Sequence, residues 1–140
     1  MTNVPETLVD RELELDTLGV AFLSSFRLNI VEDGTARHAI DVIAHLDEAL
    51  FGCRDCRTVL TAVQRVIARH GVVAPVLVRD DLRRHHALDE LRFVLPSIAG
   101  GAAGVISAID GYADRLVELA KRRAAYLRAT REAAQLLEIP

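Results

Sequence analysis

The sequence Pro96-Ser-Ile-Ala-Gly-Gly-Ala-Ala-Gly-Val-Ile-Ser-Ala-Ile-Asp-Gly111 carries no charge before Asp110. Small residues recur in it four positions apart, as at Gly100 and Gly104, and residues four apart share one face of a helix. A face made of Gly, Ala and Ser lets a second backbone approach closely. The stretch therefore predicts a close helix crossing around which the other helices are assembled.

The apolar residues that follow this stretch alternate in steps of four and three, which is the spacing of a coiled coil. A helix over residues 98–137 has more apolar seam than one 140-residue bundle can cover. Either this helix breaks near Gly111 or its far end packs on a second chain. We expect the second arrangement, with the crossing and the seam between copies of the chain. The predicted interface consists of Gly100, Gly101, Gly104, Ser107, Ile109, Tyr112, Leu116 and Leu119.

Composition favours packed helices. Hydrophobic residues make up 51% of the 140 residues and aromatic residues only 4%, so the core must consist mainly of Leu, Val, Ile and Ala. The formal charge of −3 argues against extensive nucleic-acid binding. No uninterrupted apolar run reaches the length of a membrane span. These features predict one cytoplasmic domain over residues 1–140, with no membrane span and no cofactor.

Periodic apolar stripes predict a bundle of four to five helices with a long, coiled-coil-like C-terminal helix. The expected helices cover about residues 4–30, 35–51, 55–70, 80–95 and 98–137. Residues 18–31 are apolar enough to be buried on all sides. Thr35 and Asp55 are plausible N-caps. The β-branched run 72–78 is expected to be a buried connector, and Pro96 is expected to end the fourth helix.

Cys53 and Cys56 form a Cys-x-x-Cys pair between two predicted helices. The helix N-terminus and the neighbouring Arg57 are expected to lower the pKa of Cys56, making it the more reactive thiol. The segment 40–71 resembles the AhpD-like and carboxymuconolactone-decarboxylase families. That resemblance implies a helical thiol redox protein using these two residues, although Leu60 stands where the family has a His. The alternative is two small buried residues at a helix junction.

Two further patterns could carry chemistry. One is a set of His and carboxylate residues on two helical faces, which could bind a metal if the faces met and are otherwise solvated polar surface. The other is Arg65 followed five positions later by His70, which resembles the Arg-x4-His motif of HEPN ribonucleases. The candidate metal ligands are His38, Asp41, His45, Glu48, His85 and Asp89.

Each of these partial motifs lacks a member. The apolar seam is uninterrupted in its N-terminal half, and Arg123 and Thr130 interrupt its second half. The sequence therefore favours a non-enzymatic interaction or assembly module that self-associates through its C-terminal helices, with no resident metal. A further protein partner is possible, and a nucleic-acid partner is disfavoured. The alternatives are the thiol redox protein and the HEPN-like ribonuclease.

Overall fold

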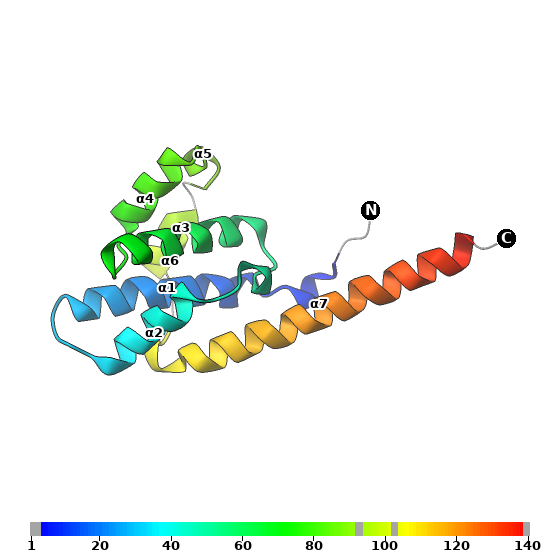
Figure 1. Ribbon diagram of the computed structural model, residues 1–140, viewed down its shortest axis with the longest axis horizontal. Helices are drawn as coiled ribbons and strands as arrows, with labels where there is room; N and C mark the ends of the chain where they lie inside the picture. The colour runs from blue at the N-terminus through cyan, green and yellow to red at the C-terminus, as the bar shows by residue number, and fades with distance from the viewer. Residues whose placement is uncertain (1–3, 92–93, 102–103, 139–140) are drawn as a thin grey trace.

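A computed structural model describes residues 4–91, 94–101 and 104–138 of the chain. All regular structure within these ranges is helical, which confirms the all-α class. Helix α7 is the expected long C-terminal helix, and it extends well past the rest of the molecule (Figure 1). The elements, with η marking a turn of 3₁₀ helix, are η1 (Glu6–Leu8), α1 (Arg11–Leu28), α2 (Gly34–Ala44), η2 (Glu48–Leu50), α3 (Arg54–His70), α4 (Pro75–Arg84), α5 (Leu88–Leu91), α6 (Val94–Gly101), η3 (Ile106–Ala108) and α7 (Ile109–Glu138).

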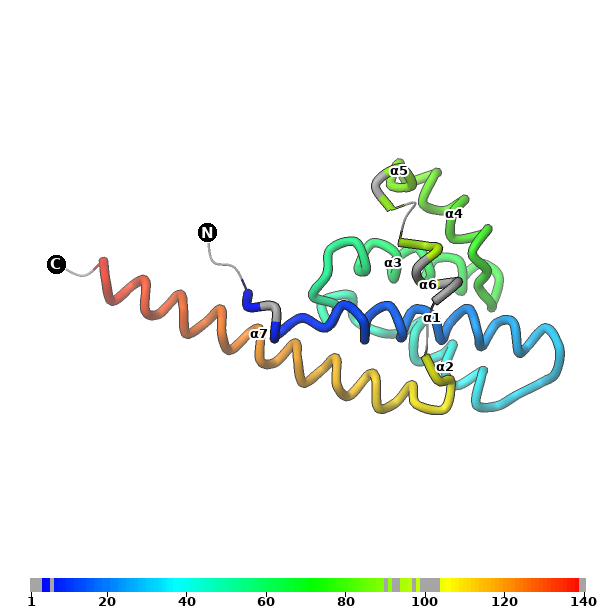
Figure 2. The backbone as a smooth tube through the Cα atoms, turned by 180° about the vertical axis from the view of Figure 1, so that it is seen from behind, coloured from blue at the N-terminus to red at the C-terminus, as the bar shows by residue number. Residues whose placement is uncertain are grey.

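Helix α1 lies at the centre of the bundle. It contacts α2, α3, α6 and α7, and Figure 2 shows it running beside α7 in the opposite direction. Its buried residues include polar Glu14 and Thr17 as well as apolar Leu18 and Phe22. A helix that is buried on most of its surface has no solvent-facing stripe, so its sequence shows little amphipathic period.

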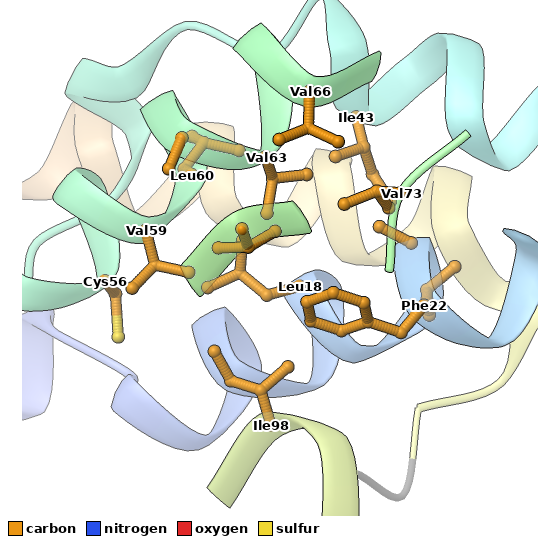
Figure 3. Close-up of a cluster of buried hydrophobic side chains, with 14 of the residues drawn as sticks. Leu18, Phe22, Ile43, Cys56, Val59, Leu60, Val63, Val66, Val73 and Ile98 are labelled. Carbon is orange, nitrogen blue, oxygen red and sulfur yellow. The ribbon is translucent and has the colours of Figure 1, made fainter. Parts of the chain in front are cut away.

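Helix α3 contributes the most regular face of the core. Val59, Val63 and Val66 follow helical spacing and are each at most 2% exposed. Figure 3 shows them packed with Leu18 of α1 and Ile98 of α6. The stripe predicted in this segment, which consists of Leu60, Val63 and Ile67, is also buried, because in an amphipathic helix the periodic apolar positions face the core.

Several helix starts differ from the sequence-based expectation. Asp33, rather than Thr35, caps α2, because its carboxylate accepts hydrogen bonds from the backbone of Thr35 and Ala36. Pro75 begins α4 at its first helical position, where its missing N–H costs nothing, so the expected connector is partly helix. Pro96 likewise lies in the first turn of α6 instead of ending a helix.

The expected continuous helices over 80–95 and 98–137 are both interrupted. Helix α4 ends at Arg84, and His86 has a left-handed φ of 57° before α5 begins. Farther on, α6 ends at Gly101, and Val105 is extended, with φ −110° and ψ 123°, before η3 and α7. Glycine is a poor helix former, and the glycine-rich segment therefore joins two helices instead of continuing one.

Gly104 makes the close backbone approach that the small residues predict, but the approach is within one chain. A Cβ atom at Gly104 would lie 2.5 Å from the backbone oxygen of Asp16 and 3.0 Å from Cγ2 of Val20, both in α1. The expectation that this crossing joins two chains is thus wrong for Gly104. The surroundings of Gly100 and Gly101 lie outside the residues whose packing is described.

We expect Gly104→Ala to destabilise the fold, because the new methyl group must displace α1 backbone. Overpacking of this kind costs about 1–3 kcal/mol. Gly111→Ala in α7 is the matched control, since a Cβ there meets nothing within 4 Å. It should stabilise the protein by up to about 1 kcal/mol through helix propensity. Urea unfolding measures both, and a Gly104→Ala variant as stable as the parent contradicts the crossing.

Candidate functional site

The apolar seam of α7 divides into a covered part and a free part. Ile109, Leu116 and Leu119 are at most 2% exposed and belong to the chain's own core. Tyr112 is half-buried, and its hydroxyl accepts a hydrogen bond from the backbone N–H of Val105 at 3.0 Å. Ser107 is exposed. Most of the residues predicted to form an interface therefore pack within the subunit, and the uncovered part of the seam lies farther along the helix.

We call residues 126–138 of α7 the arm. At about 100° per residue, its side chains divide into two opposite halves. One half carries only charged or amide side chains, and the other carries apolar side chains and one Thr. The polar half consists of Arg128, Arg131, Glu132, Gln135 and Glu138, and the apolar half of Tyr126, Leu127, Ala129, Thr130, Ala133, Ala134, Leu136 and Leu137.

The apolar half of the arm is largely open to solvent. Leu136 is 70% exposed and Leu137 88% exposed, whereas Tyr126 and Thr130 are partly covered. An isolated helix of this length is marginal in water, and most helices are stabilised by packing one apolar face. The described residues of the body therefore leave most of the apolar half of the arm without a packing surface.

A second apolar surface lies at the opposite end of the molecule, where α1 ends. Leu23, Phe26 and Ile30 are exposed there, although the sequence predicted burial of the whole segment 18–31. With Val105 and its neighbours they line a groove of about 620 Å³. The prediction failed because the turn into α2 leaves the last turns of α1 covered on one side only.

The other chemically rich region joins the starts of α1 and α3. The Glu14 carboxylate is 1% exposed and accepts hydrogen bonds from the backbone N–H groups of Gly52 and Cys53, each at 3.0 Å. Ligand atoms of Glu14, Cys53 and Cys56 lie within 4.8 Å of one another. We call these three residues the thiol–carboxylate cluster. Sequence reasoning missed Glu14, because it lies in a run of acidic residues that includes Glu12 and Asp16 and nothing in the sequence sets it apart from them.

Arg11 is the cation closest to this cluster. Its guanidinium donates to Asp55 Oδ1 at 2.7 Å and lies 3.9 Å from the Cys56 sulfur. Burial is the largest cause that raises the pKa of both thiols, and the Glu14 charge raises both further. Cys56 is fully buried and its pKa rises strongly. The predicted activation of Cys56 is therefore wrong, because burial and nearby carboxylates outweigh the helix N-terminus.

Arg123 is a buried cation beside the cluster. Its guanidinium donates to the carbonyl oxygens of Leu8 at 3.0 Å and Leu50 at 2.9 Å, and it lies close to Ala49. Its charge also lowers the pKa of Glu14, against the larger effect of burial. The residue that interrupts the apolar seam therefore ties α7 to η1 and η2.

The candidate metal ligands on the helical faces do not converge. His38 bonds to Asp110 of α7 at 2.9 Å, and His45 bonds to the carbonyl oxygen of Asp41 at 2.8 Å. The remaining candidates are also apart, with Glu48 bonded to Thr61, His85 to the Asp81 backbone, and Asp89 exposed. Across the described ranges, the thiol–carboxylate cluster is the group of three or more potential ligands that comes together.

Arg65 has a structural role. Its guanidinium makes a two-pronged contact with Asp81, which is 2% exposed, at 2.6 Å and 3.0 Å. The pair joins α3 to α4. His70 is exposed at the last turn of α3, where a cation suits the helix dipole. The Arg of the Arg-x4-His motif, Arg65, is therefore held in an ion pair with Asp81.

Comparisons with protein-family models, curated proteins and solved structures gave no match. Within the described part of the chain, no helix combines enough length with enough apolar character to cross a bilayer.

Arg123→Leu extends the apolar seam in the sequence, but we expect it to destabilise the protein. The carbonyl oxygens of Leu8 and Leu50 lose a charged donor, at a cost of roughly 2–3 kcal/mol. Arg122→Leu is the neighbouring control, since Arg122 makes only an exposed pair with Glu118, worth at most about 1 kcal/mol. Equal losses for the two variants in urea unfolding contradict the assigned role of Arg123.

Glu14 gives stability a distinctive pH dependence. Burial raises its pKa above the ordinary value of 4.5. The folded state then holds the proton more tightly than the unfolded chain, so this contribution is complete below pH 4.5 and is lost as pH rises through the folded-state pKa. Glu14→Gln cannot titrate. We therefore expect the unfolding free energy of the parent minus that of Glu14→Gln to fall as the pH rises above 4.5. A flat or rising difference contradicts the assignment.

Proposed function

We propose that the chain is a non-enzymatic assembly module of the cytoplasm, in which two copies associate through their arms. The observation that supports this most is the division of residues 126–138 into an apolar and a polar half with the apolar half uncovered. Among the described residues, the body covers Tyr126 and Thr130 only in part and leaves Leu136 and Leu137 exposed, although it buries Leu116 and Leu119 on the preceding turns of the same helix.

The charges along α7 favour a second copy as the partner. Lys121, Arg122, Arg128 and Arg131 precede or lie within the first half of the arm, and Glu132 and Glu138 follow. Antiparallel pairing of two arms therefore places the acidic end of each beside the basic part of the other. A parallel pair places like charges side by side, which is unfavourable. The antiparallel arrangement also keeps the two bodies at opposite ends of the paired helices.

The apolar surface of the arm suits close packing of two helices. Ala129, Ala133 and Ala134 leave room for the partner backbone, while Leu127 and Leu137 provide larger contacts. Two arms of about 20 Å bury less area than a standard protein interface. We therefore expect dissociation constants on the order of micromolar rather than nanomolar.

We expect Ala133→Glu to abolish self-association while leaving the fold intact, because it puts a charge in the middle of the apolar half. Gln135→Glu adds the same charge on the polar half and should leave association unchanged. Sedimentation velocity over a range of protein concentrations measures the effect, with urea unfolding as the check of the fold. A parent chain that stays monomeric at about 100 µM, well above the micromolar range expected for such an interface, refutes the proposal.

A charge reversal tests the orientation. In antiparallel arms, Glu132→Arg with Glu138→Arg turns attraction into repulsion and weakens the dimer. Adding Arg128→Glu and Arg131→Glu to the same chain restores opposite charges and should restore association. In a parallel pair the first change replaces one like-charge contact with another and leaves the affinity nearly unchanged.

Thiol redox chemistry is a second candidate, favoured by the approach of the Cys53 and Cys56 sulfurs to within 4.8 Å of each other. The thiolate is the reactive form, and the raised pKa of both thiols keeps them protonated at neutral pH. Leu60 also leaves the pair without the His of the AhpD-like proteins. The assembly module is therefore the better-supported function, and the ribonuclease is less supported because Arg65 is bound to Asp81.

A further inference from the structure

We propose that Glu14, Cys53 and Cys56 bind a thiophilic divalent cation of the Zn²⁺ class. The three donor atoms lie within 4.8 Å of one another, and they come from two helices that are far apart in sequence. With Zn–S bonds of about 2.3 Å, two sulfurs in a tetrahedral site lie about 3.8 Å apart. The present separations, all within 4.8 Å, are close to those of such a site.

Two backbone hydrogen bonds hold the Glu14 carboxylate in the orientation that a metal ligand needs. Its two oxygens accept the backbone N–H groups of Gly52 and Cys53, and each carboxylate oxygen retains a further lone pair. Hydrogen bonds from outside the ligand set commonly fix the orientation of metal-binding side chains. A Cβ at Gly52 would lie 2.8 Å from a methyl carbon of the Val9 side chain, so a larger residue there would require Val9 to shift.

The charges around the cluster suit a bound cation. A divalent ion with two thiolates and one carboxylate carries a net charge of −1, and Arg11 lies 3.9 Å from the Cys56 sulfur to offset it. The N-terminus of α3 also favours a negative group. Binding converts two thiols into thiolates, so each ion that enters releases two protons. Because both thiols are protonated at neutral pH, this release should be nearly complete.

The donor set selects the class of ion. Thiolates favour Zn²⁺, Co²⁺ or Cd²⁺ over Mg²⁺ and Ca²⁺, which prefer oxygen ligands. Three protein ligands leave the fourth tetrahedral position to water or to a small ligand. Cys53 is only partly buried and gives the ion a route from solvent. The site ties the start of α1 to the start of α3 and does not depend on the arm.

The test is a Co²⁺ titration of the reduced full-length chain. We expect a thiolate-to-cobalt charge-transfer band that saturates at one ion per chain and disappears when Zn²⁺ is added. Calorimetry with Zn²⁺ in buffers of different ionisation enthalpy should give about two protons released per ion. The chain contains two Cys, so a thiolate band can arise only from this cluster.

Variants separate this cluster from other binding. Cys53→Ser and Cys56→Ser should each lose the band, and Glu14→Gln should bind Zn²⁺ about tenfold more weakly or worse. The control is a double variant, His38→Ala with His45→Ala, which removes two exposed imidazoles outside the cluster. It should bind Zn²⁺ like the parent. Circular dichroism checks the fold of each variant. The cobalt spectrum of the parent chain remains a valid test even if a variant fails to fold.

Three results overturn the proposal. The first is a reduced parent chain without a thiolate band at saturating Co²⁺. The second is Zn²⁺ binding that is lost in the His variant and kept in Cys53→Ser. The third is proton release near zero, which means that the thiols do not ligate. If reduced protein binds no ion but readily forms a Cys53–Cys56 disulfide, the redox function replaces the metal site.

Discussion

The burial of α1 on most of its surface is the constraint on which the other elements depend. No single neighbour can cover such a helix, so α2, α3, α6 and α7 must all reach it. Buried polar groups usually need a partner inside the protein, and on the described α1 only the Ser24 hydroxyl lacks one. Thr17 donates to its own helix at Leu13, and Ser25 accepts from the backbone of Val73. Glu14 accepts from the start of α3, so covering α1 also fixes where α3 begins.

Elements with one buried face were predictable from the sequence. The stripe of α3 appears at its correct position because each apolar residue in it, such as Val59 or Val63, faces the core. Helix α1 was placed only approximately, because a helix surrounded by protein has no polar face to set its register. The small residues near Gly104 correctly indicated a close approach. They could not show that the approaching backbone is that of Asp16 in the same chain. A helix face made of small residues leaves room for any backbone, whether it belongs to the same chain or to another.

The candidate site was predicted only in part for a related reason. Cys53 and Cys56 were recognised from their local spacing, and so was their position at a helix start. The direction of their pKa shift depends on burial and on Glu14, which is far away in the sequence. Arg123 is a similar case, because its partners Leu8 and Leu50 are brought to it only by the folded chain. Long-range partners of this kind leave no periodic signal.

The order of the helices along the chain has a consequence for synthesis. Helix α1 is synthesised before α7, which covers one of its sides, and the other described helices come between them (Figure 1). Contacts such as that between Arg123 and Leu8 join residues near the two ends of the described chain. Closing such long loops is slow, and incompletely covered apolar surface attracts chaperones. The nascent chain must therefore keep its central helix partly exposed until α7 has been translated.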